Sequence, residues 1–299
     1  MGNNIKLMKN NACIDATIFT KDEAISGISK RFGIPLEEIA AISDEVGDIP
    51  FLKTPGLCFV GAPTNAQDRV KETLSSMENG YVSSLKVYEG FKDFYSRAEK
   101  KGAKLVISDR DGVLKEGSNM QWGEEFRKLA LEMGQPSKPL VSVLTGSSYN
   151  QNLDFMKKYG LDERLRVNPE VEKHPHLLSV EGGAIHVNVL TGELVNYVAY
   201  INPGLLKVLK GEFERKVKER LEKEVLPALN LGWSKNYDDQ TEKVYHIEDK
   251  LSMVSFNVPR KFKDGTPYRE SPEAEQFRNM TIKIMEETAQ KLNTPYEIL

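Results

Sequence analysis

The sequence predicts an α/β protein with a largely parallel sheet, followed by a smaller α+β domain. Short apolar runs of strand length alternate with segments whose apolar residues recur at helical spacing, and this alternation is typical of parallel strands connected by helices. After Ala184 the alternation gives way to a hairpin pattern and long charged helices. We therefore expect a core over 19–184 and a second domain formed by 185–299 together with 1–18.

The core is expected to open with a helix that begins at Thr20. Thr20 and Glu23 have the spacing of a capping box, in which each side chain satisfies a free amide at the start of the helix. Lys21 then lies in the first helical turn, and Gly33 with Pro35 ends the helix. We expect strands at 39–43, 57–60, 104–107, 140–144 and 177–180, and further helices at 66–77, 84–101, 122–133 and 149–159.

The second domain is expected to combine hairpins with two long helices. The pattern predicts a hairpin over 185–202 that turns at Thr191-Gly192, helices at 203–226 and 272–293, and strands within 243–258. Because chain termini commonly lie close together at a domain surface, a strand beginning at Tyr296 and strands near 5–19 should complete this same domain.

Composition limits the partners and the compartment. A net charge of -3 over 299 residues gives no general attraction to nucleic acid or to an anionic membrane. Residues 1–11 lack the apolar run of a signal peptide, and no stretch reaches the roughly 18 apolar residues of a membrane span. Cys13 and Cys58 are two cysteines in a large chain, which favours a reducing cytoplasm over a disulfide framework.

An Asp-x-Asp-Gly turn, Asp109 to Gly112, follows the run that starts at Lys104. This places two carboxylates at the C-terminal end of a predicted strand, the edge at which open α/β sheets bind ligands. The same four residues also fit an ordinary turn, so the motif alone does not establish catalysis. A calcium-binding EF-hand is excluded, because Gly112 comes too early and a strand precedes the motif.

Three further groups of polar residues stand at the ends of predicted elements. Thr145-Gly146-Ser147 follows a strand and precedes a helix, and such a turn can hold phosphate with hydroxyl groups and free amides. Asp44 and Asp48 follow the strand at 39–43, and Lys21 begins the first helix. Taken singly, each also fits a helix cap or a solvated charge.

Taken together, the four groups resemble the motifs of haloacid dehalogenase superfamily phosphatases. These motifs are an Asp-x-Asp-Gly turn, a Thr or Ser at a strand end, a Lys and an acidic pair. The chain order differs, because Lys21, Asp44 and Asp48 precede the Asp109 turn. The resemblance therefore implies a circular permutation, or alternatively halves of two tandem domains. The segment 181–184 and the residues after it resemble the branch with a C2-type α/β cap, which implies a Rossmann-like three-layer core.

The resemblance also implies the catalytic roles. Asp109 would attack phosphorus and form an aspartyl-phosphate, and Asp111 would protonate the leaving oxygen and then deprotonate water. Lys21, Thr145 and the turn at 146–147, including Gly146 and Ser147, would hold the phosphoryl oxygens.

A Mg²⁺ cofactor follows from the same resemblance, because a phosphate dianion needs a cation among several carboxylates. The family pattern assigns the metal to the Asp109 carboxylate, the Asp111 backbone carbonyl and Asp44. Asp48 either supports the metal or orients Lys21.

The expected function is hydrolysis of a small phosphate ester, such as a sugar phosphate or a phosphorylated hydroxy acid. Val113, Arg110, Ser43 and Gly47 depart from the residues common in the family motifs, but none of them replaces a catalytic side chain. A phosphomutase with the same intermediate and a non-catalytic binding module with the same fold remain alternatives. Neither the substrate nor the oligomeric state follows from the sequence.

Overall fold

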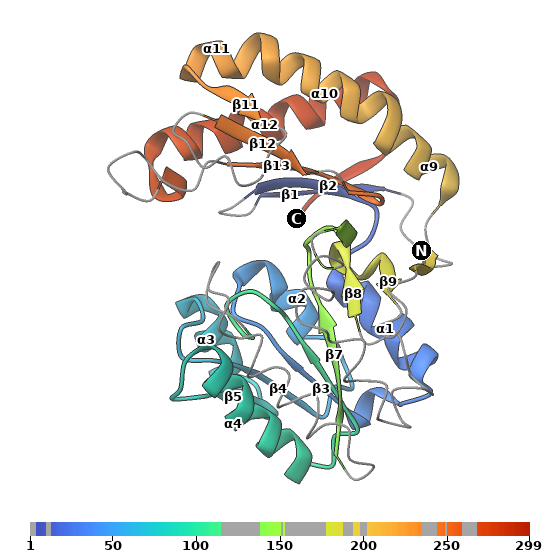
Figure 1. The fold of residues 1–299 in the computed structure, drawn as a ribbon, viewed down its shortest axis with the longest axis vertical. Helices are drawn as coiled ribbons and strands as arrows, with labels where there is room; N and C mark the ends of the chain where they lie inside the picture. The colour runs from blue at the N-terminus through green and yellow to red at the C-terminus, as the bar shows by residue number, and fades with distance from the viewer. Residues whose placement is uncertain are drawn as a thin grey trace. The chain divides into compact units, whose positions relative to one another are not determined.

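A computed structural model describes residues 4–9, 13–114, 138–150, 152, 178–187, 194–197, 202–234, 244–248, 250–258 and 268–299. The chain divides into two compact units, one formed by Met1–Phe19 with Ala199–Leu299 and the other by Thr20–Val198. Each unit is built on a sheet of its own (Figure 1).

The Thr20–Val198 unit contains an eight-stranded sheet in the order β10-β9-β8-β7-β6-β3-β4-β5. The strands are β3 (Ile39–Ile42), β4 (Phe59–Ala62), β5 (Gly80–Val82), β6 (Leu105–Ser108), β7 (Leu140–Leu144), β8 (Leu178–Val180), β9 (Ile185–Val187) and β10 (Leu194–Tyr197). The six neighbouring strands from β5 to β8 pair in parallel, and β9 and β10 add antiparallel pairs. The predicted α/β class with a mostly parallel sheet is confirmed, and this arrangement is compatible with a Rossmann-like fold.

The central strands of this sheet are buried along their whole length. Every residue of β3, β6 and β7 is buried, as expected for parallel strands covered on both faces. The helices of the unit are α1 (Lys21–Phe32), α2 (Ile49–Leu52), α3 (Asp68–Ser75) and α4 (Val87–Lys100). The Phe94 ring of α4 stacks on Phe59 with centroids 5.0 Å apart, and a Cβ at Gly61 would overlap the Phe94 ring. Gly61 therefore lets α4 approach the sheet closely.

Helix α1 begins and ends where the sequence predicts. The backbone amide of Thr20 donates to the Glu23 carboxylate at 3.0 Å, so the predicted capping box forms. Lys21 is the first residue of the helix, and Gly33 ends it in a left-handed conformation with φ of 64°, which glycine adopts without a steric penalty. The residues that begin and end α1 therefore determine that Lys21 lies in its first turn.

The other unit contains a six-stranded sheet in the order β11-β12-β13-β2-β1-β14. The strands are β1 (Ile5–Lys9), β2 (Cys13–Thr17), β11 (Gly232–Ser234), β12 (Val244–Glu248), β13 (Met253–Asn257) and β14 (Tyr296–Ile298). β1 pairs in parallel with β14, and β2 pairs antiparallel with β13. Segments from the two ends of the sequence therefore share one sheet, as the sequence analysis expects.

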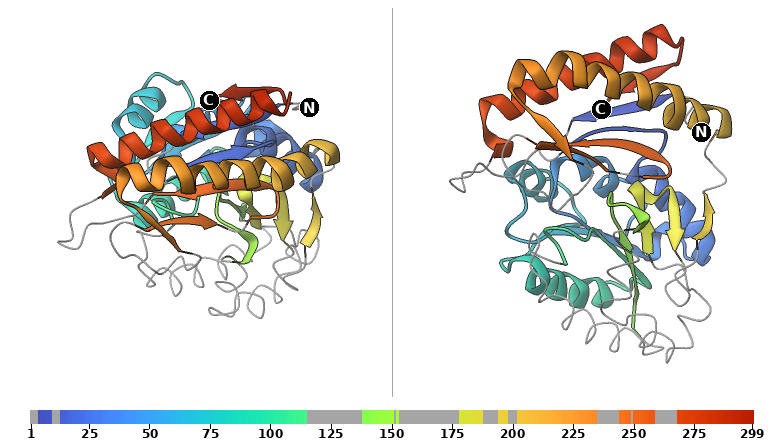
Figure 2. Two further views of the ribbon diagram at one scale, coloured as in Figure 1. Left: turned by 90° about the horizontal axis from the view of Figure 1, so that it is seen from above. Right: turned by 45° about the horizontal axis from the view of Figure 1, so that its top comes forward.

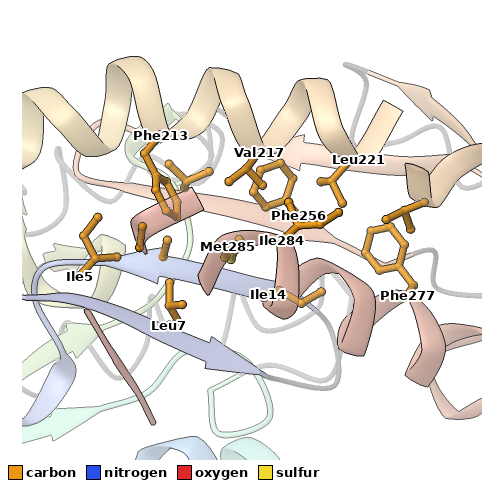
Figure 3. Close-up of a cluster of buried hydrophobic side chains, with 14 of the residues drawn as sticks. Ile5, Leu7, Ile14, Phe213, Val217, Leu221, Phe256, Phe277, Ile284 and Met285 are labelled. Carbon is orange, nitrogen blue, oxygen red and sulfur yellow. The ribbon is translucent and has the colours of Figure 1, made fainter. Parts of the chain in front are cut away.

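Helices lie along one face of this second sheet (Figure 2). They are α9 (Pro203–Val208), α10 (Glu214–Arg220), α11 (Leu226–Leu229) and α12 (Pro272–Lys291), with π-helical turns at Leu209–Phe213 and Leu221–Val225. Alternate strand residues such as Ile14 and Phe256 pack against Phe213 and Phe277 from the helices (Figure 3). Among the described helices, none combines the length and apolar character needed to cross a membrane.

The predicted boundary after residue 184 is wrong. β9 pairs antiparallel with β8, with Ser179 opposite His186, so the strands after Ala184 extend the first sheet and the boundary falls after Val198. A hairpin pattern does not reveal which sheet a strand joins. The short strands β5 and β11 were not predicted. The helix expected at 122–133, the turn at 191–192 and most of the helix expected at 149–159 lie outside the described residues.

Replacing Phe256 by Ala should destabilise the Met1–Phe19 and Ala199–Leu299 unit. Phe256 is fully buried, and truncating a buried Phe costs about 3–5 kcal/mol through lost burial and the cavity left behind. The matched variant Ile298→Ala alters a side chain in the same sheet that is 56% exposed and should cost less than about 1 kcal/mol. Urea unfolding measures both, and equal losses would contradict this packing.

Candidate active site

The predicted site residues follow three adjacent parallel strands. Asp44 comes two residues after β3, Asp109 directly follows β6, and Thr145 directly follows β7. β6 lies between β3 and β7 in the sheet, and the Asp109 amide donates to the Ile42 carbonyl at 3.0 Å. Because parallel strands end at the same edge, sheet pairing brings these three positions together.

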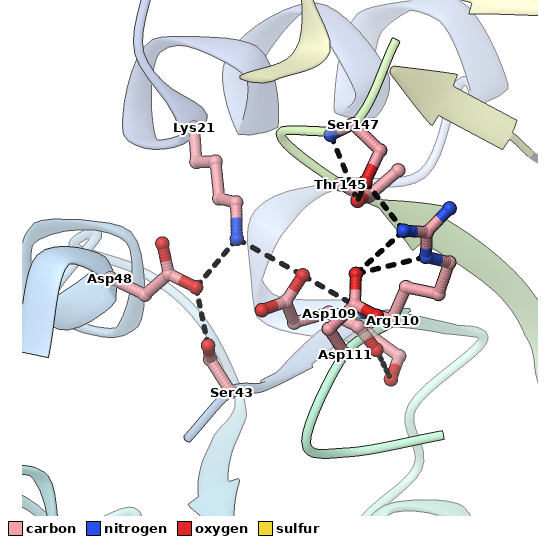
Figure 4. A network of polar contacts seen from close by, with 9 residues as sticks. Lys21, Ser43, Asp48, Asp109, Arg110, Asp111, Thr145 and Ser147 are labelled. Atoms are coloured by element: carbon pink, nitrogen blue, oxygen red, sulfur yellow. Dashed lines mark hydrogen bonds and ion pairs between the residues drawn. The ribbon is translucent and has the colours of Figure 1, made fainter. Parts of the chain in front are cut away.

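Lys21 joins the acidic residues of two loops. Its Nζ lies 2.6 Å from Oδ2 of Asp48 and 3.1 Å from Oδ1 of Asp109, and the three side chains converge from separate elements (Figure 4). The buried hydroxyl of Ser43 also donates to Asp48. The predicted convergence of the first fifty residues with the Asp109 turn is therefore observed.

Burial and charge act in opposite directions on these groups. Burial disfavours the charged form of Lys21, but the carboxylates of Asp109 and Asp48 raise its pKa above the usual value. Burial raises the pKa of Asp109 well above its usual range, and although Lys21 lowers it, Asp48 and Asp44 raise it further. Lys21 therefore stays charged, whereas burial and the acidic neighbours favour the uncharged form of Asp109.

Asp44 lies against the Asp109–Gly112 turn. Gly112 has a φ of 77°, and a Cβ built on it would overlap the Asp44 carboxylate. Oδ1 of Asp44 is buried and has no hydrogen-bond partner among the residues that the structure describes. Burial, together with the negative charges of Glu45 and Asp48, raises the pKa of Asp44 to about 7 against the opposing effect of Lys21.

The Thr145 turn is held by backbone bonds on both sides. The Thr145 amide donates to the Ser179 carbonyl at 2.9 Å, and its carbonyl accepts from the Gly182 amide at 3.0 Å. Oγ1 of Thr145 accepts from the Ser147 amide at 3.2 Å. A Cβ at Gly146 would meet no atom of the described residues within 4 Å, so their packing does not require glycine there.

Arg110, which the sequence analysis noted only as a departure from the family pattern, is a buried part of the site. Its guanidinium donates to Oδ2 of Asp111 at 2.7 and 3.0 Å, to Oγ of Ser147 at 2.5 Å and to Oδ1 of Asn152 at 2.8 Å. It therefore links the Asp109 turn to the Thr145 turn. In the sequence, the position of Arg110 between Asp109 and Asp111 could have indicated an ion pair. A charged residue in a turn ordinarily points to solvent, however, so a buried position was not expected.

The acidic residues were tested as ligands for a divalent cation. Within the described part of the chain, no group of three or more His, Cys, Asp or Glu side chains is arranged to bind a metal. The unpartnered oxygen of Asp44, and the repulsion that Asp44 and Asp48 exert on the Asp109 carboxylate, nevertheless fit a hard cation with oxygen ligands, such as Mg²⁺. Asp48 is bonded to Lys21 and Ser43, which fits the alternative that it orients the lysine.

Comparisons of the chain with protein-family models, with curated proteins and with solved structures find no match. The site is therefore interpreted from its own geometry. Lys21, Asp48 and Asp109 are in direct contact, Asp44 lies against Gly112, and Arg110 joins Asp111 to the Thr145 turn. The predicted site residues thus fall within a single unit of the chain.

In metal-free buffer, Asp44→Asn should remove a pH dependence of stability. The Asp44 pKa is about 7 in the folded chain against an ordinary value of 3.8, so between these values the folded chain holds a proton that the unfolded chain has lost. The free energy of unfolding should fall as the pH rises from about 4 to 7. The amide that replaces the carboxyl group cannot ionise, so above pH 7 the variant should be more stable by at most about 4 kcal/mol.

Urea unfolding at about pH 4 and about pH 8, the two ends of this window, measures the effect. Added Mg²⁺ should stabilise the wild-type chain at pH 8 and leave Asp44→Asn unchanged, because a ligand that binds only the folded state stabilises it. A variant with the same pH profile and the same response to Mg²⁺ as wild type would show that Asp44 plays neither part.

Gly112→Ala should disrupt the contact between the Asp109 turn and Asp44. Gly102→Ala is a matched control, because Gly102 has a similar φ of 84°, but an added Cβ there would meet no atom within 4 Å in the part of the chain that the structure describes. The control should lose about 1 kcal/mol from left-handed strain alone, and Gly112→Ala should lose about 1–3 kcal/mol more from the overlap. Thermal unfolding measures the stability of both variants. Equal losses of stability would show that Asp44 does not lie against Gly112.

Proposed function

We propose that this protein is a Mg²⁺-dependent phosphomonoester hydrolase that acts through an aspartyl-phosphate, in the manner of the haloacid dehalogenase superfamily. The observation that carries the proposal is the 3.1 Å contact between Nζ of Lys21 and Oδ1 of Asp109 at the carboxyl end of the sheet. The chain order of the motifs differs from that of the family, but the direct contact of Lys21 with Asp48 and Asp109 supports the proposal. The substrate class is a small phosphate ester, such as a sugar phosphate or a phosphorylated hydroxy acid.

Asp109 acts as the nucleophile. A carboxylate oxygen attacks phosphorus, the bond from phosphorus to the leaving oxygen breaks, and Asp111 gives that oxygen its proton. Asp111 then takes a proton from water, which attacks the aspartyl-phosphate and releases inorganic phosphate with free Asp109. The side chain of Asp111 is 47% exposed, which allows it to exchange protons with water.

Positive charge and hydrogen-bond donors stabilise the phosphoryl group during transfer. Lys21 stays charged because of Asp109 and Asp48, and its ammonium holds one phosphoryl oxygen. The Thr145 hydroxyl, the Gly146 amide and Ser147 hold others. Donors fixed in advance around a site from which water is excluded are worth more than the same donors in water.

Mg²⁺ would be held by the carboxylates of Asp44 and Asp109 and by the backbone carbonyl of Asp111. When bound, it neutralises the excess negative charge of these groups and polarises the phosphoryl oxygens. Asp48 acts on Lys21, because its carboxylate already bonds to that ammonium and to Ser43.

The fold supports the same proposal. The mostly parallel sheet with its helices is assigned as a three-layer, Rossmann-like catalytic core, and the unit formed by Met1–Phe19 and Ala199–Leu299 as its α/β cap. The pairing of β1 with β14 and of β2 with β13 supports a permuted chain over tandem half-domains, because the two ends of one sequence complete one sheet.

Asp109→Asn should lower phosphatase turnover by roughly 10³-fold or more, because the amide cannot serve as nucleophile. The measurement is phosphate release from a panel of sugar phosphates, with Mg²⁺ and with a chelator, which should also abolish turnover. Asp68→Asn is the control, since the Asp68 side chain is 89% exposed and should leave the rate unchanged. Turnover that survives in Asp109→Asn would refute the proposal.

A further inference from the structure

Arg110 has no role in the reaction outlined above, yet it is more deeply buried than its neighbour Asp111. The Arg110 side chain is 10% exposed, and burying a guanidinium is costly unless its N–H groups are paired. Its Nε, Nη1 and Nη2 all donate to side chains of the site. An ordinary surface arginine has no such arrangement.

The guanidinium of Arg110 donates hydrogen bonds to Asn152 on one side and to Asp111 on the other. Nη1 donates to Asn152, which is 1% exposed and in turn donates to the Ser148 carbonyl at 2.8 Å. Nε and Nη2 donate to the same oxygen of Asp111 at 3.0 and 2.7 Å. Figure 4 shows the Arg110 guanidinium between Asp111 and Ser147. The half-exposed carboxylate of Asp111 is thus bonded to a guanidinium that Ser147 and the buried Asn152 hold in place.

We propose that Arg110 is a positioning residue, which holds the Asp111 carboxyl in line for proton transfer and fixes the Asp109 turn to the Thr145 turn. This inference rests on the proposed hydrolase function. The Arg110 guanidinium acts through Asp111. The backbone amide of Arg110 donates to Oδ1 of Asp109 at 2.8 Å, and a side-chain substitution keeps that bond. Its effect is geometric, because a displacement of about 1 Å in a catalytic group can cost on the order of 10²-fold in rate.

The leaving group separates this role from a merely structural one. An alkyl phosphate expels a strongly basic alkoxide and needs the proton from Asp111, whereas p-nitrophenyl phosphate expels a weakly basic phenolate and needs it far less. Loss of positioning should therefore slow the transfer of the phosphoryl group to Asp109 selectively for the alkyl ester. Hydrolysis of the aspartyl-phosphate, in which Asp111 is the base, is the same step for both esters. Loss of general structural integrity should reduce both reactions by a similar factor.

The experiment compares Arg110→Met, Asp111→Asn and the double variant on glycerol phosphate and on p-nitrophenyl phosphate. For Arg110→Met we expect kcat/KM, which covers only the steps up to loss of the leaving group, to fall by roughly 10- to 100-fold on glycerol phosphate and by less than about 3-fold on p-nitrophenyl phosphate. The double variant should be no slower than Asp111→Asn, because the arginine acts through that residue. Arg97→Met is the matched control: Arg97 pairs with Asp93 on α4, and both rates should stay unchanged.

Equal losses on the two substrates, or a double variant much slower than Asp111→Asn, would overturn the inference while leaving the hydrolase assignment in place. A wild-type chain that hydrolyses neither ester would instead overturn the proposed function and this inference with it. If circular dichroism shows Arg110→Met to be unfolded, Arg110→Lys replaces it in the same comparison. Lysine keeps the charge but lacks the planar fork of donors, so the alkyl-selective loss should persist.

Discussion

The site depends on one buried ammonium group, that of Lys21, between Asp109 and Asp48. In the proposed reaction the Asp109 carboxylate must be ionised, yet burial and its acidic neighbours raise the pKa of Asp109, so a cation has to stand beside it. Two features of the Thr20–Val198 unit bring the Lys21 ammonium to this position. The bond from Thr20 to Glu23 starts α1 at Lys21, and the pairing of β3 with β6 brings Asp48 and Asp109 to the same edge.

The sequence could predict this meeting because each component has a local signal. A capping box locates the first turn of a helix, and polar residues directly after buried parallel strands must lie at one edge of the sheet. Contacts between residues far apart in the sequence have no such local signal. The attachment of β9 to β8, which moves the boundary between the units, and the inward turn of Arg110 toward Ser147 and Asn152 depend on partners far away in sequence.

The order of the motifs along the chain matters less than where the fold brings them. The same catalytic constellation recurs on unrelated folds with its residues in different sequence orders, because chemistry depends on distances between side chains. Here Lys21 and Asp48 come from the first fifty residues, and Asp109 and Thr145 from the middle of the sequence. β1 pairs with β14 and β2 pairs with β13. The segments before and after the Thr20–Val198 unit therefore belong to the same second sheet.

The most direct test is to look for the covalent intermediate itself. The wild-type chain would be mixed with a phosphate ester that it hydrolyses, quenched in acid within the first turnover, digested and analysed by mass spectrometry. The account predicts one added phosphoryl group on the peptide that contains Asp109, attached to that side chain. Rapid hydrolysis with no phosphorylated peptide, or with the group on another residue, would contradict it.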